Sequence, residues 1–252
     1  MAKAIQSVSA LRHPNPYIND ILGLEPIKTW SLIVTIFGDY DGDVLTGSQL
    51  RMLLDPLGFK PETIRVALHR LKADGWILTQ KSGREAHYRL SARGREETEE
   101  VRSEIYGPAE DLEAWSLVLL QDRLIEKEAI PIGRDAFLVP TRTAQRVQYA
   151  LSLPLGNAPI PTWVEETLVP PQLLSTANEL TSILASAKDD LDAMAPGDLA
   201  ALRLLTLHHW RRLALRPGTR AHAALLKLGG IQQCRVAVVA LLENSWRTSF
   251  QR

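Results

Sequence analysis

The chain has 252 residues, of which 45% are hydrophobic and 23% charged, and its formal net charge at pH 7 is zero. These values are typical of a folded globular protein and argue against a disordered chain, a membrane-embedded chain or a protein that is basic over its whole surface. A local basic patch remains compatible with them, and the length favours two or three compact units.

A single cysteine, Cys234, excludes an internal disulfide and fits a reducing compartment. The first residues show neither a long apolar core nor a small-residue cleavage pattern, so we expect no signal peptide or anchor. No apolar run is long enough to cross a bilayer. The expectation is a cytoplasmic protein with no membrane partner.

The chain opens with residues 1–25, whose prolines and glycine favour an N-terminal arm. Residues 27–37 (IKTWSLIVTIF) are strongly apolar; the β-branched residues would suit a strand, but the length and a proline in the first turn favour a buried helix. Thr46 or Ser48 can then cap a second helix, which Pro56, Leu57 and Gly58 end.

Residues 60–76 (KPETIRVALHRLKADGW) predict a third helix, which Pro61 opens and Gly75 ends. Two strand-like segments follow, at 76–80 and 86–90, and they predict a hairpin. The order helix, helix, short turn, helix, hairpin is that of a winged helix-turn-helix.

The rest of the chain predicts a glutamate-rich connector helix, a small middle domain and a helical end. Residues 115–121 and 137–139 are the strand candidates, and from residue 171 onward the periodicity is helical. We therefore expect an α+β fold that is mostly helical. Its parts are an arm at 1–25, a winged helix-turn-helix at 26–94, the connector and middle domain at 95–170, and a helical domain at 171–252.

The helix at 60–76 has an apolar stripe and a polar face that suits DNA. At 3.6 residues per turn, Ile64, Ala67, Leu68 and Leu71 face inward. A major groove accepts one helix, in which arginine pairs with guanine and small or aromatic side chains meet other base edges. The residues expected to read bases are Thr63, Arg65, Val66 and His69, and those expected to reach phosphates are Lys60, Arg70, Lys72, Lys81 and Arg84.

The alternative is an ordinary amphipathic helix with a solvated charged face, in which Arg65 or Arg70 pairs with Asp55 or Asp74. The capped helix before it and the basic hairpin after it favour the DNA-reading interpretation. A module that contacts only proteins would suit an acidic face, and this face is basic.

Several segments resemble the family of phenylacetic acid degradation regulators, the PaaX-like repressors. The residues that carry the resemblance are 31–39 (SLIVTIFGD), 63–76 (TIRVALHRLKADGW), 83–84 with 88–94 (YRLSARG), 105–106 with 115–120 (WSLVLL), and 204–216 (LLTLHHWRRLALR). The resemblance implies a winged helix-turn-helix, a ferredoxin-like middle domain and a helical C-terminal domain. It also implies a homodimer that binds double-stranded operator DNA and represses aromatic-acid catabolic genes until an aryl-acyl-CoA, typically phenylacetyl-CoA, releases it.

The helix at 204–216 matches a His-x-aromatic-Arg pattern of that family, and it lies in a block without acidic residues. Arginine forks suit the phosphates of a CoA thioester. The candidate effector contacts are His208, Trp210, Arg211, Arg212 and Arg216. As alternatives, the arginines pair with Asp189, Asp190 and Asp192 or with the connector glutamates, and Trp210 is a core residue.

The chain departs from the family pattern in two places. The segment 121–140 is short, which implies a reduced ferredoxin-like unit, and the residues after Arg216 also differ from the pattern. No nucleophile elbow, phosphate-binding glycine loop or triad is visible, so we expect no enzymatic activity and no cofactor. Adjacent histidines such as His208 and His209 point to different sides of a helix, so we expect no metal.

Overall fold

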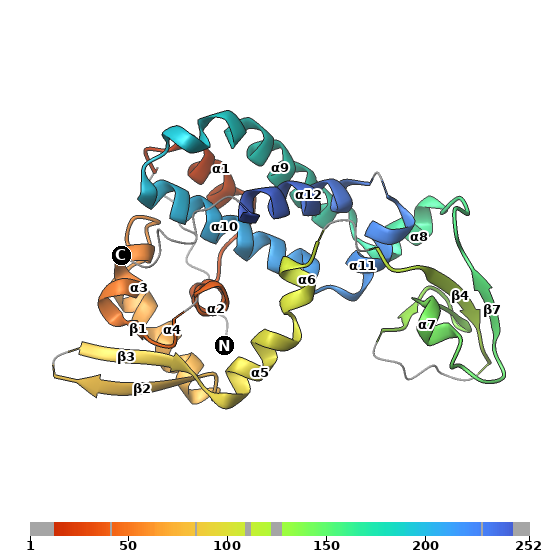
Figure 1. Ribbon diagram of the computed structural model, residues 1–252, viewed down its shortest axis with the longest axis horizontal. Helices are drawn as coiled ribbons and strands as arrows, with labels where there is room; N and C mark the ends of the chain where they lie inside the picture. Colours follow the sequence, from red (N-terminus) through yellow and green to blue (C-terminus); the bar gives the residue numbers. More distant parts are fainter. Residues whose placement is uncertain are drawn as a thin grey trace.

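The computed structural model describes residues 13–40, 42–83, 85–108, 112–121, 128–227 and 229–243. Helices dominate, and the strands form two small antiparallel sheets, so the mixed and mostly helical class predicted from the sequence is confirmed. The molecule is elongated, with a three-stranded sheet at one end, a helical body in the middle and a four-stranded sheet at the other end (Figure 1).

The N-terminal unit contains its helices and strands in the predicted order. They are α2 (Thr29–Asp39), β1 (Leu45–Thr46), α3 (Gly47–Leu54), α4 (Pro61–Ala73), β2 (Ile77–Ser82) and β3 (Glu85–Leu90). The strands are antiparallel in the order β1-β3-β2, with Leu45 opposite Tyr88 and Thr79 opposite Tyr88 on its other side. The strand β1 has no counterpart in the sequence prediction.

The first apolar run, for which the sequence left a strand or a buried helix possible, forms the helix α2. It begins at Thr29, so Pro26 precedes its first turn instead of lying in it. Its residues Leu32, Ile33, Val34, Thr35, Ile36 and Phe37 are all buried. A helix that is apolar on every side is one that neighbouring elements cover completely, which explains why the periodicity of this run is weak.

Residues Pro16–Leu24 form a helix, α1, where the sequence predicted an arm. Asn15 caps its start by accepting a hydrogen bond from the Tyr17 amide (3.0 Å), and Pro16 occupies the first turn. Ile18 and Ile21 are fully buried against the helical body. The prolines that suggested an extended arm thus belong to a helix start, while residues 1–12 lie outside the described part.

The helical body is built around α10 (Pro196–Ala214), in which every residue from 200 to 210 is buried. Around it lie α1, α8 (Thr162–Leu168), α9 (Pro171–Ala187), the short 3-10 helix η1 (Lys188–Ala193), α11 (Pro217–Leu225) and α12 (Gly230–Glu243). One apolar core runs without interruption from α1 through the N-terminal unit into α12. Within the described ranges, no single helix has the length and hydropathy to span a membrane.

A connector leads from the N-terminal unit to the second sheet. It consists of α5 (Ala92–Glu100) and α6 (Arg102–Tyr106), and the sheet contains β4 (Trp115–Leu119), β5 (Ile130–Pro131), β6 (Ala136–Pro140) and β7 (Leu151–Pro154) in the order β5-β6-β4-β7. The strands β4 and β6 are the two predicted ones. The short helix α7 (Thr141–Ala144) covers one face over Val118, Phe137 and Val139. A ferredoxin-like unit would need a helix after β4, and residues 122–127 there lie outside the described part.

A buried ion pair ties the N-terminal unit to the body. Arg203 on α10 has 2% of its surface exposed and donates two hydrogen bonds to Asp39 at the end of α2, at 2.8 and 2.7 Å. It also donates to the Leu242 carbonyl of α12 at 3.2 Å, and the Tyr106 hydroxyl of α6 donates to Asp39 at 3.3 Å. The ends of α2, α6 and α12 therefore meet on α10.

Candidate nucleic-acid interface

The joint between α3 and α4 fixes the angle at which α4 is presented. Thr46 and Gln49 form a capping box at the start of α3, which confirms one of the two predicted caps. Between the helices, Leu57 and Phe59 are 2% and 4% exposed, so two apolar side chains anchor this turn in the core. The sequence prediction used Leu57 only as part of a helix end and did not single out Phe59.

The inner stripe of α4 is as predicted, because Ile64, Ala67, Leu68 and Leu71 are all buried. They pack α4 against α2 and the start of β2. This stripe fixes the rotation of α4 about its axis, and so determines which of its side chains point away from the protein.

The outer face of α4 carries the predicted base-reading residues. Arg65, Val66 and His69 are exposed, and Thr63 is partly buried at the edge of the face. The Val66 side chain is 70% exposed although it is apolar. An arginine, an imidazole and an exposed apolar group along one helix face can meet guanine edges and thymine methyl groups in a major groove.

The C-terminal end of α4 is closed by a tight backbone motif. Gly75 has φ = +74°, its amide donates to the Lys72 carbonyl at 3.1 Å, and the Trp76 amide donates to the Leu71 carbonyl at 2.9 Å. This is the Schellman arrangement, which requires a left-handed residue that glycine supplies without strain. Gly94 on α5 lies against the same place, since a Cβ there would come within 2.4 Å of the Trp76 carbonyl oxygen.

Among the residues predicted to contact phosphates, the lysines are exposed, whereas Arg70 has partners within the protein. Lys60, Lys72 and Lys81 are exposed on α4 and on the hairpin, and Arg84 lies outside the described residues. Arg70 pairs with Asp74 at 3.5 Å, as one of the alternatives proposed, and its guanidinium lies 5.0 Å from the centre of the Trp30 ring.

Arg65 forms no ion pair or hydrogen bond within the described part of the chain. Its side chain is thus available to a group from outside the described part of the chain. The contact between Arg70 and Trp30 was missed, because nothing in the spacing of residues 30 and 70 indicates that they meet. An exposed pair such as Arg70 and Asp74 contributes little stability, so DNA phosphate can compete for this arginine.

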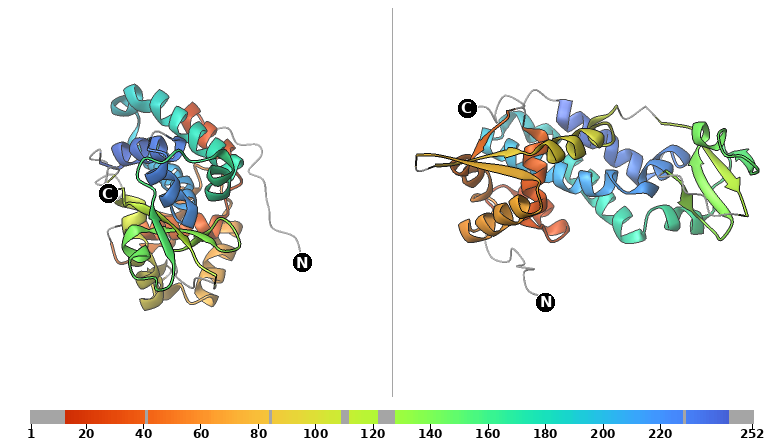
Figure 2. Two further views of the ribbon diagram at one scale, coloured as in Figure 1. Left: turned by 90° about the vertical axis from the view of Figure 1, so that its right-hand side faces the viewer. Right: turned by 90° about the horizontal axis from the view of Figure 1, so that it is seen from below.

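The β2–β3 hairpin projects from the same end of the molecule as α4, as the view from below shows (Figure 2). Beside its turn the hairpin contacts the start of α3, where the Ser48 amide donates to the carboxylate of Glu85, the first residue of β3, at 3.4 Å. Hydrogen bonds from Ser48 and Thr46 lower the pKa of Glu85, although burial acts in the opposite direction. The end of the hairpin next to its turn is therefore attached to the start of α3.

The candidate effector residues on α10 do not converge on one site. His208 and Trp210 are 1% and 2% exposed, and the Trp210 indole donates to the Ile105 carbonyl of α6 at 3.0 Å. Burial, reinforced by the neighbouring His209, lowers the pKa of His208 to about 3. Both side chains are core groups, so the core alternative holds for Trp210 and a direct ligand contact for His208 is not supported.

The candidate arginines on α10 and just after it have different surroundings. Arg212 pairs with Glu25 after α1, at 2.5 Å, and Arg216 is exposed where α10 meets α11. The predicted pairing with the acidic segment at 189–192 is not what the structure has, and Asp190 instead accepts a hydrogen bond from Tyr17 at 2.5 Å. Arg211 lines a surface cleft together with residues of α2, α5 and α6. In the described ranges, no three histidine, cysteine or acidic residues gather where they could hold a metal ion.

Comparisons with known proteins find a family to which the N-terminal unit is similar. Residues 28–94 match the sequence model of the family described as PaaX-like protein. This segment is PaaX-like. The match begins at Lys28, the cap of α2, and ends at Gly94, the glycine that packs α5 on Trp76, so the PaaX-like segment spans the whole unit that presents α4.

Similarity extends beyond the PaaX-like segment. The chain is 27% identical over 242 residues to the transcriptional repressor PaaX of Escherichia coli (strain K12), covering 79% of this chain and 75% of that protein. That relative is a regulator and not an enzyme, in agreement with the prediction of no enzymatic activity. An uncharacterized protein of Mycobacterium tuberculosis, Rv0674, is 16% identical, with a TM-score of 0.42 over 88% of this chain and 97% of that one.

Proposed function

We propose that the chain is a DNA-binding transcriptional repressor whose N-terminal unit is a winged helix-turn-helix. The supporting observation is α4, which lies in the PaaX-like segment and exposes Arg65, Val66 and His69 above a fully buried stripe. In this proposal α4 enters the major groove, and the β2–β3 hairpin is the wing that reaches the adjacent backbone with Lys81.

The finer parts of the proposal come from the family resemblance. The repressor is a homodimer on a palindromic operator, acts in the cytoplasm, and controls genes for phenylacetate or aromatic-acid catabolism. An aryl-acyl-CoA such as phenylacetyl-CoA releases it. A two-fold dimer matches a palindrome because each protomer then meets one half-site. The alternative is a winged-helix regulator with another effector or none, or a module that contacts proteins instead of DNA.

The test begins with selection of bound duplexes from a random library, because the operator sequence is not known. Affinity for the selected site is then measured by fluorescence anisotropy for the wild type, Arg65→Ala, His69→Ala and the control Arg216→Ala. Arg216 is also an exposed arginine, but it lies between α10 and α11, outside the N-terminal unit. Loss of a base contact is expected to weaken binding by about 1–3 kcal/mol and to relax the selected sequence at one position.

Arg216→Ala is expected to bind like the wild type, and binding by all four proteins should weaken steeply with salt. Unchanged affinity and unchanged selected sequences for both α4 variants would show that α4 does not read DNA. A selected site without two-fold symmetry would contradict the homodimer. Recovery of no duplex at all would leave the protein-contact alternative.

A further inference from the structure

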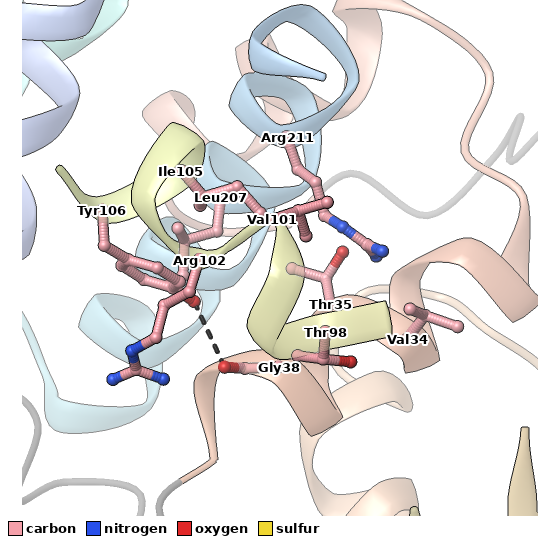
Figure 3. A pocket seen from close by; sticks show the side chains of 10 residues that line it. All are labelled: Val34, Thr35, Gly38, Thr98, Val101, Arg102, Ile105, Tyr106, Leu207 and Arg211. Carbon is pink, nitrogen blue, oxygen red and sulfur yellow. Dashed lines mark hydrogen bonds between the residues drawn. The ribbon is translucent and has the colours of Figure 1, made fainter. Parts of the chain in front are cut away.

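A cleft opens where the N-terminal unit, the connector and the helical body meet. Its walls come from α2, α5, α6 and α10, as Figure 3 shows. Much of the lining is apolar and includes Val34, Val101 and Leu207. It lies at the joint through which α4 is attached to the body, because α2 packs on α4 on one side and on α10 on another.

Arg211 is the unusual residue of this cleft. It is partly buried, and Figure 3 shows it reaching from α10 towards α2. The other buried or partly buried arginines on α10, α11 and α12 that the structure describes have partners, namely Arg203, Arg220 and Arg235. Arg211 has no hydrogen bond or ion pair within the described ranges.

The charge of Arg211 is therefore not balanced by a carboxylate in the described part of the chain. Among the lining residues, Arg102 is a second cation, stacked 5.4 Å from the centre of the Tyr106 ring, and no lining residue is acidic. Burial lowers the pKa of Arg211, which means that the cleft disfavours its charged form. A partly desolvated guanidinium keeps its charge at neutral pH, so an anion that reaches it would gain a strong charge-assisted hydrogen bond.

The polar groups that line the cleft favour a ligand that accepts hydrogen bonds over one that donates them. The hydroxyl of Thr35 donates to the Ser31 carbonyl at 3.1 Å, and that of Thr98 donates to the Gly94 carbonyl at 2.7 Å. Both hydroxyl protons are thus engaged, and the guanidinium supplies the available donors. What fits beside Arg211 is an anionic oxygen group, since Val34 and Leu207 in the wall are themselves 4% and 1% exposed.

We propose that the cleft binds a carboxylate or phosphate group through Arg211, and that this is where a small-molecule effector acts. The inference of binding stands on the cleft, and only its regulatory consequence rests on the proposed function. An occupant between α2 and α10 would press on the joint that holds α4, and so would favour an arrangement with weaker DNA binding.

The experiment measures the melting temperature of the full chain with three probes: phenylacetate, which offers only a carboxylate; coenzyme A, which offers only phosphates; and phenylacetyl-CoA. Sodium chloride holds the ionic strength constant. The variants are Arg211→Met, which keeps the length and removes the charge, and Arg216→Met, which removes the same charge from an exposed position just beyond the end of α10.

At ten times its dissociation constant, a bound probe should raise the melting temperature of the wild type and of Arg216→Met by roughly 3–6 °C. The rise should be absent in Arg211→Met. That variant should melt no lower than the wild type without a probe, because it loses a partly buried charge that has no partner. Should it fail to fold, Arg211→Lys takes its place, and it should respond at a probe concentration at least tenfold higher.

Whichever of phenylacetate and coenzyme A reproduces the shift identifies the group that Arg211 holds. An equal shift in wild type and Arg211→Met, or no shift with any probe, overturns the proposal. DNA affinity measured on the same preparations separates the two ideas: the effective probe should weaken DNA binding at least about fivefold. A melting shift in a protein that binds no DNA would refute the repressor function but keep the anion site.

Discussion

Replacing Asp39 by asparagine should destabilise the protein far more than its position at a helix end suggests. The variant leaves Arg203, which is 2% exposed, facing a neutral amide, whose NH2 group would point one of its own donors at the guanidinium. Two hydrogen bonds, at 2.8 and 2.7 Å, depend on the carboxylate. Breaking a buried pair so that one charge stays uncompensated costs about 3–5 kcal/mol.

Urea unfolding followed by circular dichroism measures this cost. The matched control is Asp43→Asn in the same unit, since Asp43 is 86% exposed and pairs with Arg95 at 3.2 Å on the surface. It should lose at most about 1 kcal/mol. The double variant Asp39→Leu, Arg203→Met replaces both charges by apolar groups and should recover most of the loss.

The reasoning would be refuted by a loss in Asp39→Asn no larger than in Asp43→Asn. It would also fail if the double variant were as unstable as the sum of its two single variants. Additivity would mean that the two side chains do not interact, so that removing one charge would leave no penalty on the other.

Two further predictions concern stability. Gly94→Ala should cost about 1–3 kcal/mol in urea unfolding, because its Cβ would come within 2.4 Å of the Trp76 carbonyl oxygen, whereas Gly133→Ala, with its nearest contact at 3.5 Å, should change little. Acid should destabilise the protein below pH 6.5. Burial lowers the pKa of His208 to about 3 and that of His209 to about 4, while the unfolded chain takes up these protons near pH 6.5. The stability that the two neutral histidines contribute is therefore complete above pH 6.5 and is lost as the pH falls towards 4. At pH 5 the loss in the free energy of unfolding is about 2 kcal/mol for each histidine. His209→Leu should reduce the slope between pH 5 and 6, and an unchanged slope would show that His209 does not contribute to it.

Local features of the candidate interface could be predicted from the sequence. The stripe of α4 depends only on helical periodicity, and its two ends depend on Pro61 and Gly75, which act within their own turns. The capping box of α3 and the strands β4 and β6 are local in the same sense. For this reason the elements from α2 to β3 were predicted in the right order, apart from the two residues of β1.

The misjudged features depend on contacts between residues far apart in the chain. Arg212 pairs with Glu25 and Arg203 with Asp39, and neither partner can be inferred from spacing along α10. A sequence shows that a block is rich in arginine, but only packing decides which arginine receives a carboxylate. Arg211 differs from its neighbours in having no hydrogen bond or ion pair within the described ranges, and this could not be known before the fold was known.

The segment 28–94 can be recognised as a unit in the sequence, yet it is not a separable piece of the protein. Six consecutive residues of α2 are buried, and part of their cover is α10, which lies more than a hundred residues further along the chain. A fragment cut at those boundaries would expose an apolar helix surface and leave the Asp39 carboxylate without its arginine. This unit therefore cannot be transferred between proteins as an independent domain, and any new body that carries it must supply a matching helix and its buried cation.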